Sequence, residues 1–377
     1  MKIGILTQPL HDNYGGLLQA YALKEILQGM GHEVIIINRK FKEISKIWKT
    51  ASILKSKLIG RKIDPSLLLS DKNKRRISEH NQSSIKNYIP NLSHSITDNR
   101  GMIDLNNMGF DAYVVGSDQC WRPMYSPQIS NYFLDFAENQ KHIKRIAYAA
   151  SFGVSEWEFS EEDCRVCSKL AKKFDAISVR EDSGIELVNK HFGMDVVHLI
   201  DPTMLLTREH YVKIINKEKQ TENEGLLKAY VLDKTLDKQK LIDIVGKKLG
   251  LKQFEVLPKK NIDKDEVEDI NDFIYPHPVK WLKGFQDAKF VITDSFHGTI
   301  FSILFNIPFI AIGNEERGMA RFDSLLKMFG LRDRLITNID SFVINNLENN
   351  QIDWSGINLI LEKERDKAMV FFKTNLQ

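Results

Sequence analysis

One short loop in the second half of the sequence combines residue types suited to proton transfer and anion binding. Asp294, Ser295 and His297 follow an apolar run, and Gly298 opens the helical pattern that comes next. Ser295 and Gly298 are candidate binding residues, and Asp294 is a candidate base; the alternative is that Asp294 or Ser295 only caps that helix. A histidine beside a bound phosphate can donate a proton or a charge-assisted hydrogen bond. Lone histidines are usually structural, but a position at a helix start favours a catalytic role for His297.

A second candidate loop, Asn13-Tyr14-Gly15-Gly16, separates the first apolar run from the first helical pattern. Its two glycines allow a ligand to approach the backbone, and free amides at a helix start favour an anion. Asn13, Gly15 and Gly16 are therefore candidate binding residues. The alternative is that the glycines only form a tight turn and that Asn13 only caps the helix.

Arg180 is a candidate for binding an anionic substrate. It comes directly after the apolar run 176–179, at the end of an expected strand. A guanidinium at such a strand end suits bidentate binding of a carboxylate or a phosphate. The local alternative is a salt bridge to the neighbouring Glu181 or Asp182. Arg145, and Lys144 beside it, are further possible cations for the same ligand.

A third polar turn, Gly116-Ser117-Asp118-Gln119, also follows an apolar run, and Trp121 comes shortly after it. Ser117 and Gln119 are candidate ligands for a sugar, Trp121 a candidate aromatic wall of its site, and Asp118 a candidate base for a sugar hydroxyl. Gly, Ser and Asp also form ordinary turns, so a purely structural role explains these residue types equally well.

These turns must be positioned by strands and helices, and the sequence alternates between the two almost throughout. Such alternation is typical of parallel sheets with helical crossovers, in which ligands bind beyond the carboxyl ends of the strands. The apolar runs predict strands at 2–7, 34–38, 112–116, 145–150, 176–179, 228–232, 253–257, 289–293 and 308–312. Helical spacing predicts helices at 15–30, 161–174, 238–249, 279–286, 298–304 and 358–375.

A chain of 377 residues is long for one core, which predicts two domains. The alternation breaks at Asp201-Pro202, so we place an N-terminal Rossmann-like domain at 1–202 and a C-terminal one at 203–350. The tail, 351–377, is expected to form a helix that docks across both domains.

Composition excludes several classes of function. Apolar residues make up 42% and charged residues 27%, as in ordinary globular proteins, and a net charge of +3 is too small to indicate nucleic acid as a partner. The pattern at residues 2–7 is not that of a secretory signal. The longest apolar stretch, 299–313, is broken by Asn306 and Pro308 and is too short to cross a bilayer. We expect a cytoplasmic protein.

Three cysteines indicate a reducing compartment rather than a disulfide framework. Cys164 and Cys167 form a Cys-x-x-Cys pair, but a zinc site requires two more ligands at matching spacing, and no second pair exists. The pattern around them predicts an amphipathic helix that buries one cysteine beside Leu170. No metal is expected.

The segment 39–80 interrupts the first domain and is strongly basic, with 13 lysines and arginines against four acids. Apolar residues recur at helical spacing from Phe41 to Leu58, with Trp48 among them. A basic amphipathic helix of this kind suits peripheral contact with the inner face of an anionic membrane. The alternative is that the apolar stripe packs on the sheet and the lysines are solvated.

The chain resembles the polysaccharide pyruvyl transferase family over most of its length. The resembling segments are 13–23 (NYGGLLQAYAL), 113–121 (YVVGSDQCW), 145–153 (RIAYAASFG), 178–182 (SVRED), 198–203 (HLIDPT) and 292–310 (ITDSFHGTIFSILFNIPFI). The last of these is the most specific.

The resemblance implies a glycosyltransferase-B-like fold, in which two Rossmann-like domains face each other across a cleft. It implies phosphoenolpyruvate as the donor substrate, no further cofactor, and a sugar acceptor on a surface polysaccharide or its lipid-linked precursor. The product would be a pyruvate ketal. The family's proposed catalytic histidine corresponds to His297, and its donor-binding arginine to Arg180.

Two other functions are compatible with the sequence. A glycosyltransferase of the same fold would use a sugar nucleotide, and Glu315 or Glu316 could then bind the donor ribose. A non-catalytic, membrane-docked component of polysaccharide assembly would account for the basic segment. Identifying the donor that binds distinguishes a pyruvyl transferase from a glycosyltransferase. Turnover by the purified protein distinguishes an enzyme from a non-catalytic component.

Overall fold

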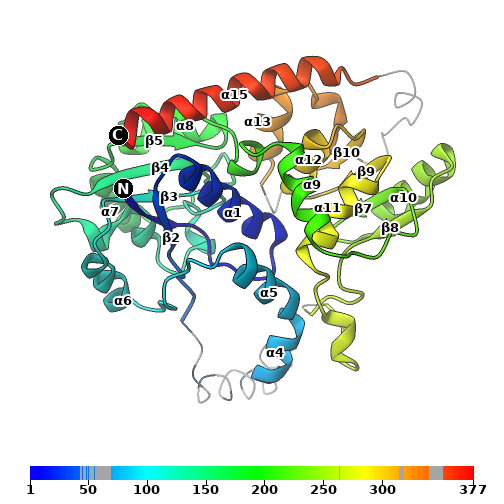
Figure 1. Cartoon of the computed structure of the whole chain (residues 1–377), viewed down its shortest axis with the longest axis horizontal. Coiled ribbons are helices and arrows are strands. Elements are labelled where there is room, and N and C mark those ends of the chain that lie inside the picture. Colours follow the sequence, from blue (N-terminus) through cyan, green and yellow to red (C-terminus); the bar gives the residue numbers. More distant parts are fainter. Residues whose placement is uncertain are drawn as a thin grey trace.

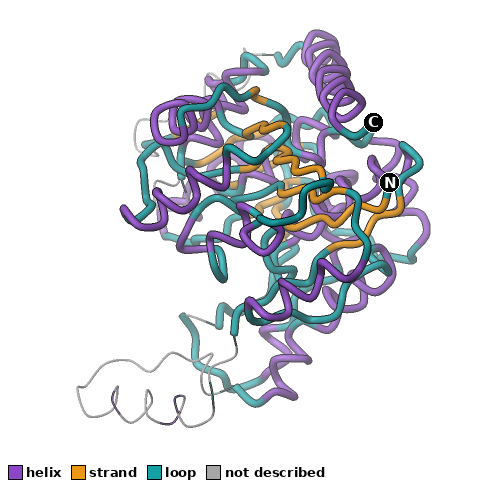
Figure 2. The backbone as a smooth tube through the Cα atoms, turned by 90° about the vertical axis from the view of Figure 1, so that its left-hand side faces the viewer, coloured by secondary structure: helices purple, strands orange, loops and turns teal. Residues whose placement is uncertain are grey.

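Two separate parallel sheets organise the chain. The computed structural model describes residues 1–42, 45, 48, 50, 55, 69–262, 264–313, 318–338 and 351–377. Within these residues, one sheet has six strands between residues 2 and 198, and the other has five between 227 and 336. Helices lie on both sides of the strands (Figure 1, Figure 2). The expected α/β class with two Rossmann-like domains is confirmed.

The first sheet has the strand order β2-β1-β3-β4-β5-β6, with every pair parallel. Its strands carry mainly Ile, Val, Ala and Tyr and are buried on both faces, as parallel strands between helical layers must be. The strands are β1 (Lys2–Leu6), β2 (Glu33–Ile36), β3 (Ala112–Val115), β4 (Lys144–Ala150), β5 (Ala176–Val179) and β6 (Val197–His198). The helices of this half are α1 (Tyr14–Gly29), α4 (Asp71–Ile77), α5 (Glu79–Tyr88), α6 (Asn99–Asp104), α7 (Glu161–Ala171) and α8 (Asp182–Phe192).

The second sheet has the order β11-β10-β9-β7-β8, again all parallel. Its strands are β7 (Leu227–Tyr230), β8 (Gln253–Glu255), β9 (Phe290–Thr293), β10 (Phe309–Ile312) and β11 (Leu335–Ile336). Its helices are α9 (Arg208–Lys217), α10 (Leu236–Leu249), α11 (Pro278–Asp287), α12 (Phe296–Leu304) and α13 (Ala320–Met328).

The direction of chain progression reverses once in each sheet, between β1 and β3 in the first and between β7 and β9 in the second. A crevice opens beyond the carboxyl ends of the strands at such a switch point, because the connections on its two sides run in opposite directions. The loops after β1 and β3 contain Asn13 and Asp118, and the first turn of α12, which follows β9, contains His297. These three candidate residues therefore follow strands that flank the two switch points, whereas Arg180 follows β5.

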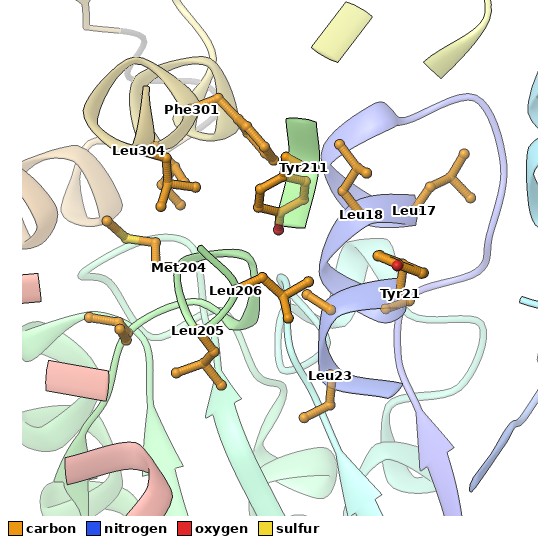
Figure 3. Packing of buried hydrophobic residues seen from close by; sticks show 14 of the residues in the cluster. Leu17, Leu18, Tyr21, Leu23, Met204, Leu205, Leu206, Tyr211, Phe301 and Leu304 are labelled. Carbon is orange, nitrogen blue, oxygen red and sulfur yellow. The ribbon is translucent and has the colours of Figure 1, made fainter. Parts of the chain in front are cut away.

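One hydrophobic core continues from the first sheet to the second. Leu17 and Leu18 of α1 lie on one side of it, and Phe301 and Leu304 of α12 lie on the other (Figure 3). Between them, Tyr211 of α9 contacts Phe301, with ring centroids 4.9 Å apart. This packing fixes the starts of α1 and α12 relative to each other.

The last helix, α15 (Trp354–Asn375), returns across the molecule to the first sheet (Figure 1). Its side chain Phe372 is fully buried and stacks on Tyr148 of β4 at 4.4 Å. Arg365 donates hydrogen bonds to the carbonyls of Met204 and Leu206 in the connector between the two sheets. The domain boundaries at 202 and 350 stay predictions.

The expected strands and helices match those observed to within a few residues, but the predicted amphipathic helix between Phe41 and Leu58 lies largely outside the described residues. The exposed side chains of Phe41 and Trp48 are described. Contact of this segment with a membrane stays a prediction. No helix in the described part of the chain is both long enough and apolar enough to cross a membrane.

Candidate active site

His297 lies in the first turn of α12, against the other domain. Ser295 caps this helix, and its hydroxyl accepts a hydrogen bond from the amide of Gly298 at 3.4 Å. Across the domain junction, a Cβ atom built on Gly15 would lie 2.1 Å from Nδ1 of His297. A side chain at position 15 would therefore displace the imidazole, so the glycine in the first turn of α1 provides the space that His297 occupies.

Asp201 joins His297 to Arg180. Its Oδ2 atom lies 3.5 Å from Nε2 of His297 and accepts a hydrogen bond from Arg180 at 2.7 Å. Its Oδ1 atom accepts hydrogen bonds from the amide and the hydroxyl of Thr203. The other end of the Arg180 guanidinium donates to Asp118 at 3.1 Å. Four groups from three strand ends and α12 thus form one chain of contacts, His297–Asp201–Arg180–Asp118.

The network is almost completely shielded from solvent, since the side chains of Arg180 and Asp201 are each only 1% exposed. Burial alone raises the pKa of Asp201, but His297, Arg180 and Thr203 lower it more, and the net shift is downward. The pKa of Asp118 is also lowered, because the charges of Arg180, His297 and Arg321 outweigh burial. Both carboxylates are therefore ionised at neutral pH.

The local alternative for Arg180, a salt bridge to one of the next two residues, is wrong. Glu181 instead accepts hydrogen bonds from the amides of Phe152 and Gly153, and Asp182 pairs with Lys327 of α13. The partners of Arg180 are distant in sequence, because parallel strands bring their carboxyl ends to one edge of the sheet.

Asp294 is held by three donors. Its carboxylate accepts hydrogen bonds from the amides of Leu232 and Asp233, at 2.7 and 3.0 Å, and from Lys238 at 2.8 Å. Its side chain is completely buried. These contacts connect the loops after β7 and β9 and favour a structural role. Asp294 as a base stays a prediction.

The turn after β1 is capped as predicted, with the Asn13 side chain accepting a hydrogen bond from the amide of Gly16 at 3.2 Å. In the turn after β3, Ser117 is fully buried and donates to the carbonyl of Ala149, which places its hydroxyl behind the site. Gln119 faces the cleft and accepts a hydrogen bond from Arg122.

The structure places three of the expected ligand residues away from the cleft. Arg145 lies near the amino end of β4, and its guanidinium donates to the carbonyls of residues 137, 140 and 143, away from the cleft. Trp121 is fully buried, stacks on Phe133 at 4.8 Å and donates to the carbonyl of Tyr132, so it belongs to the core. Lys144, beside Arg145, donates instead to the carbonyls of Asn375 and Gln377.

A cleft of about 940 Å³ opens between the two sets of strand ends, next to this network. Its inner wall combines residues of both domains, namely Asn13, Gly16, Asp118, Gln119, Asp294, Ser295, Phe296, His297 and Arg321. Two of its charged residues, Asp12 and Arg321, were not predicted from the sequence. Asp12 is half-buried and accepts a hydrogen bond from Asn81 of α5 at 2.9 Å.

Cys167 is buried on α7 near Leu170, as the helical pattern predicts, and both cysteines of the pair are free thiols. Among the residues that the structure describes, no group of three or more His, Cys, Asp or Glu side chains is arranged to hold a metal ion. Glu315 and Glu316, the candidate ribose ligands of a glycosyltransferase, lie outside the described residues.

Two Rossmann-like domains with a buried acid–base network at their junction define the structural class. A model of the polysaccharide pyruvyl transferase family matches residues 13–316. This match covers most of the chain, so the protein belongs to the polysaccharide pyruvyl transferase family. All six segments that resemble the family lie within it. Comparison with curated proteins gave no match.

Solved structures with a similar fold include sugar-nucleotide enzymes. A putative UDP-N-acetylglucosamine 2-epimerase from Listeria monocytogenes is 9% identical, with 94% of this chain and 90% of that chain covered and a TM-score of 0.50. Arabidopsis thaliana UGT89C1, solved with UDP-L-rhamnose, is 10% identical, with 97% and 94% covered and a TM-score of 0.49. Identities this low concern the fold alone.

Proposed function

We propose that the protein transfers the enolpyruvyl group of phosphoenolpyruvate to a sugar of a surface polysaccharide or its precursor and closes a pyruvate ketal. Family membership supports a transferase that acts on a polysaccharide or sugar acceptor. The observation that best supports this donor and this reaction is the network His297–Asp201–Arg180–Asp118 beside the interdomain cleft.

The reaction requires an acid. Protonation of the methylene carbon of phosphoenolpyruvate leaves an oxocarbenium-like centre at its second carbon, and one sugar hydroxyl adds there as it loses its proton to a base. A second hydroxyl then displaces phosphate, and its proton leaves with the phosphate. His297 is the proposed proton donor, since its imidazole borders the cleft and the ionised Asp201 lies where it can balance an imidazolium.

The donor carries a carboxylate and a phosphate, and the cleft offers groups that suit both. His297 lines the cleft, and the Arg180 guanidinium lies directly behind it through Asp201. The starts of α1 and α12 both border the cleft, and the remaining amides of a first helical turn can add neutral donors for developing negative charge. Asp118, which also lines the cleft, is the candidate base for the attacking hydroxyl.

Phosphate release tests this proposal. The purified protein is incubated with phosphoenolpyruvate and a panel of p-nitrophenyl hexosides, and the products are examined by mass spectrometry for a ketal adduct. We expect release that depends on both substrates and that falls by about a hundredfold or more in His297→Gln. His142→Gln, which changes an exposed histidine, is the matched control.

A parallel titration distinguishes phosphoenolpyruvate from a sugar nucleotide as the donor. Saturable binding of phosphoenolpyruvate without binding of UDP-glucose supports the pyruvyl transfer. Binding of UDP-glucose without phosphoenolpyruvate would replace it with a glycosyltransferase of the same fold.

A further inference from the structure

Arg321 is a buried cation that faces the cleft. It is the second residue of α13, the residue is 7% exposed, and it borders the same cavity as His297 and Asp118. Arg180 is 3% exposed, pairs with Asp118 and Asp201, and is not among the residues that line the cleft. Of the two guanidiniums, Arg321 is the one that a ligand in the cleft can reach.

Arg321 and Arg180 share one aromatic ring. The guanidinium carbon of Arg180 lies 4.6 Å from the ring centroid of Phe296, and that of Arg321 lies 5.4 Å from it. Burial and the charge of Arg180 together lower the pKa of Arg321 to about 10, although Asp118 and Glu181 act in the opposite direction. An anion beside Arg321 would reduce the repulsion between the two cations.

Contacts with the first domain fix the position of Arg321. The hydroxyl of Ser324, one turn along α13, accepts a hydrogen bond from the amide of Asp182 at 2.9 Å. Lys327 pairs with the carboxylate of Asp182 at 2.9 Å. Because α13 is anchored in this way, the backbone that carries Arg321 is held in place before a ligand arrives, which reduces the entropic cost of binding.

We infer that Arg321 binds an anionic group of the donor, and that Arg180 positions Asp118 and Asp201 rather than contacting the donor directly. A planar guanidinium binds either a phosphate or a carboxylate through two parallel hydrogen bonds. The inference rests on the proposed function for the identity of the donor. It adds a second residue of the second domain, beside His297, to the site.

The experiment measures binding by calorimetry. Phosphoenolpyruvate, inorganic phosphate and pyruvate are titrated separately into the wild-type protein, Arg321→Met, Arg321→Lys and Arg332→Met. Arg332 is an exposed arginine that pairs with Asp323 of α13, so its variant controls for loss of a positive charge near this helix. Thermal unfolding without ligand shows whether each variant is folded, and Arg321→Lys keeps the charge if Arg321→Met does not fold.

We expect Arg321→Met to weaken phosphoenolpyruvate binding by about 30-fold or more, Arg321→Lys to weaken it less, and Arg332→Met to leave it unchanged. A matching loss for phosphate alone, or for pyruvate alone, identifies the group that Arg321 holds. Wild-type binding of phosphoenolpyruvate that the Arg321 variants do not weaken would overturn the inference and leave the proposed function intact. If the wild type binds phosphate but not phosphoenolpyruvate, the proposed function fails, and the phosphate arm still tests Arg321. Binding of none of the three ligands would overturn both.

Discussion

Gly15 and His297 come from different domains and are in direct contact, so the smallest substitution at position 15 tests the placement of the imidazole. A Cβ atom on Gly15 would lie 2.1 Å from Nδ1, whereas a Cβ atom on Gly16 meets nothing closer than 3.4 Å. We expect Gly15→Ala to lower phosphoenolpyruvate-dependent phosphate release by about a hundredfold, since a displacement of about 1 Å has effects of that size. Gly29→Ala, at an exposed position of the same helix where an added Cβ atom meets nothing within 4 Å, is the matched control. Equal rates in the two variants would show that the contact does not position His297.

Asp201 should contribute strongly to stability because it neutralises a buried guanidinium. Asp201→Asn leaves the charge of Arg180 partly unpaired, and we expect a loss of about 3 kcal/mol in the free energy of unfolding at pH 7. The exposed Asp237→Asn controls for removal of a carboxylate.

The pH dependence of this effect follows from the sign of the pKa shift. The pKa of Asp201 is lower in the folded protein than its ordinary value of 3.8, so its contribution is fully present above that value and is lost as the pH falls towards the folded pKa. Urea denaturation should therefore show a constant difference between Asp201→Asn and wild type from about pH 7 to pH 5 and a smaller one below about pH 4. A difference that grows on acidification would contradict the ion pair.

The sequence indicated which residues end strands but not which of them meet. His297 and Arg180 were singled out because each follows an apolar run, and the structure connects them through Asp201. Asp201 lies in a segment that resembles the family, yet its local sequence gave it no role beyond marking a break before Pro202. Arg321 had no local signal, since an arginine near the start of an amphipathic helix is ordinarily solvated. Such contacts depend on how two domains pack, which spacing along the chain does not specify.

Strand β7 contains a lysine that the fold keeps from water. Lys228 is fully buried, and its ammonium lies 4.6 Å from the Phe285 ring centroid and 3.3 Å from the carbonyl oxygen of Trp281. Burial lowers its pKa from 10.5 to about 7, although Asp287 raises it slightly. Below pH 7 the folded protein must therefore hold a charged ammonium in an apolar environment, which costs stability.

We expect Lys228→Met to stabilise the protein, by about 3 kcal/mol near pH 6 and by less as the pH rises towards 10. Between about pH 7 and 10 the folded lysine is neutral while the unfolded one is still protonated, so wild-type stability rises with pH in this window and approaches that of the variant. Urea denaturation at several pH values measures the difference, with the exposed Lys213→Met as control. A destabilised variant would show that the ammonium makes a net favourable contact.

Most of the described strands were predictable from the sequence, but half of the described helices, namely α4, α5, α6, α8, α9 and α13, were not expected. The parallel strands are buried on both faces, which gives unbroken apolar runs in the sequence. The predicted helices begin at capping residues such as Asn13 and Ser295. Trp121 was misassigned because an aromatic residue after a polar turn has the same local pattern whether it faces a sugar or the core. Burial against Phe133 is a tertiary fact that this pattern does not contain.

The arrangement of the two domains explains why the candidate residues converge. The switch point of the first sheet, between β1 and β3, contributes Asn13, Gly16 and Asp118 to the cleft. The switch point of the second, between β7 and β9, contributes His297 from the opposite side. A ligand between them meets loops of both domains, so any change in the domain arrangement should alter catalysis before it alters either sheet.

Helix α15 provides a way to test this coupling. Arg365 donates hydrogen bonds to the carbonyls of Met204 and Leu206, at 2.7 and 2.8 Å, in the connector that follows Asp201. We expect Arg365→Met to cost about 2 kcal/mol of stability, because two carbonyls lose a charged donor. Phosphate release should fall by more than this loss of folded protein explains, since the connector also places Asp201 beside His297.

The exposed Lys363 of the same helix offers the matched control Lys363→Met, which should leave stability and turnover unchanged. Denaturation and phosphate release are measured on the same preparations, at a temperature where every variant is fully folded. Reduced turnover under these conditions means that α15 acts on the site through the connector. Wild-type turnover in a destabilised Arg365→Met would mean that α15 only holds the fold together, and that the contacts of the two domains around His297 are sufficient by themselves.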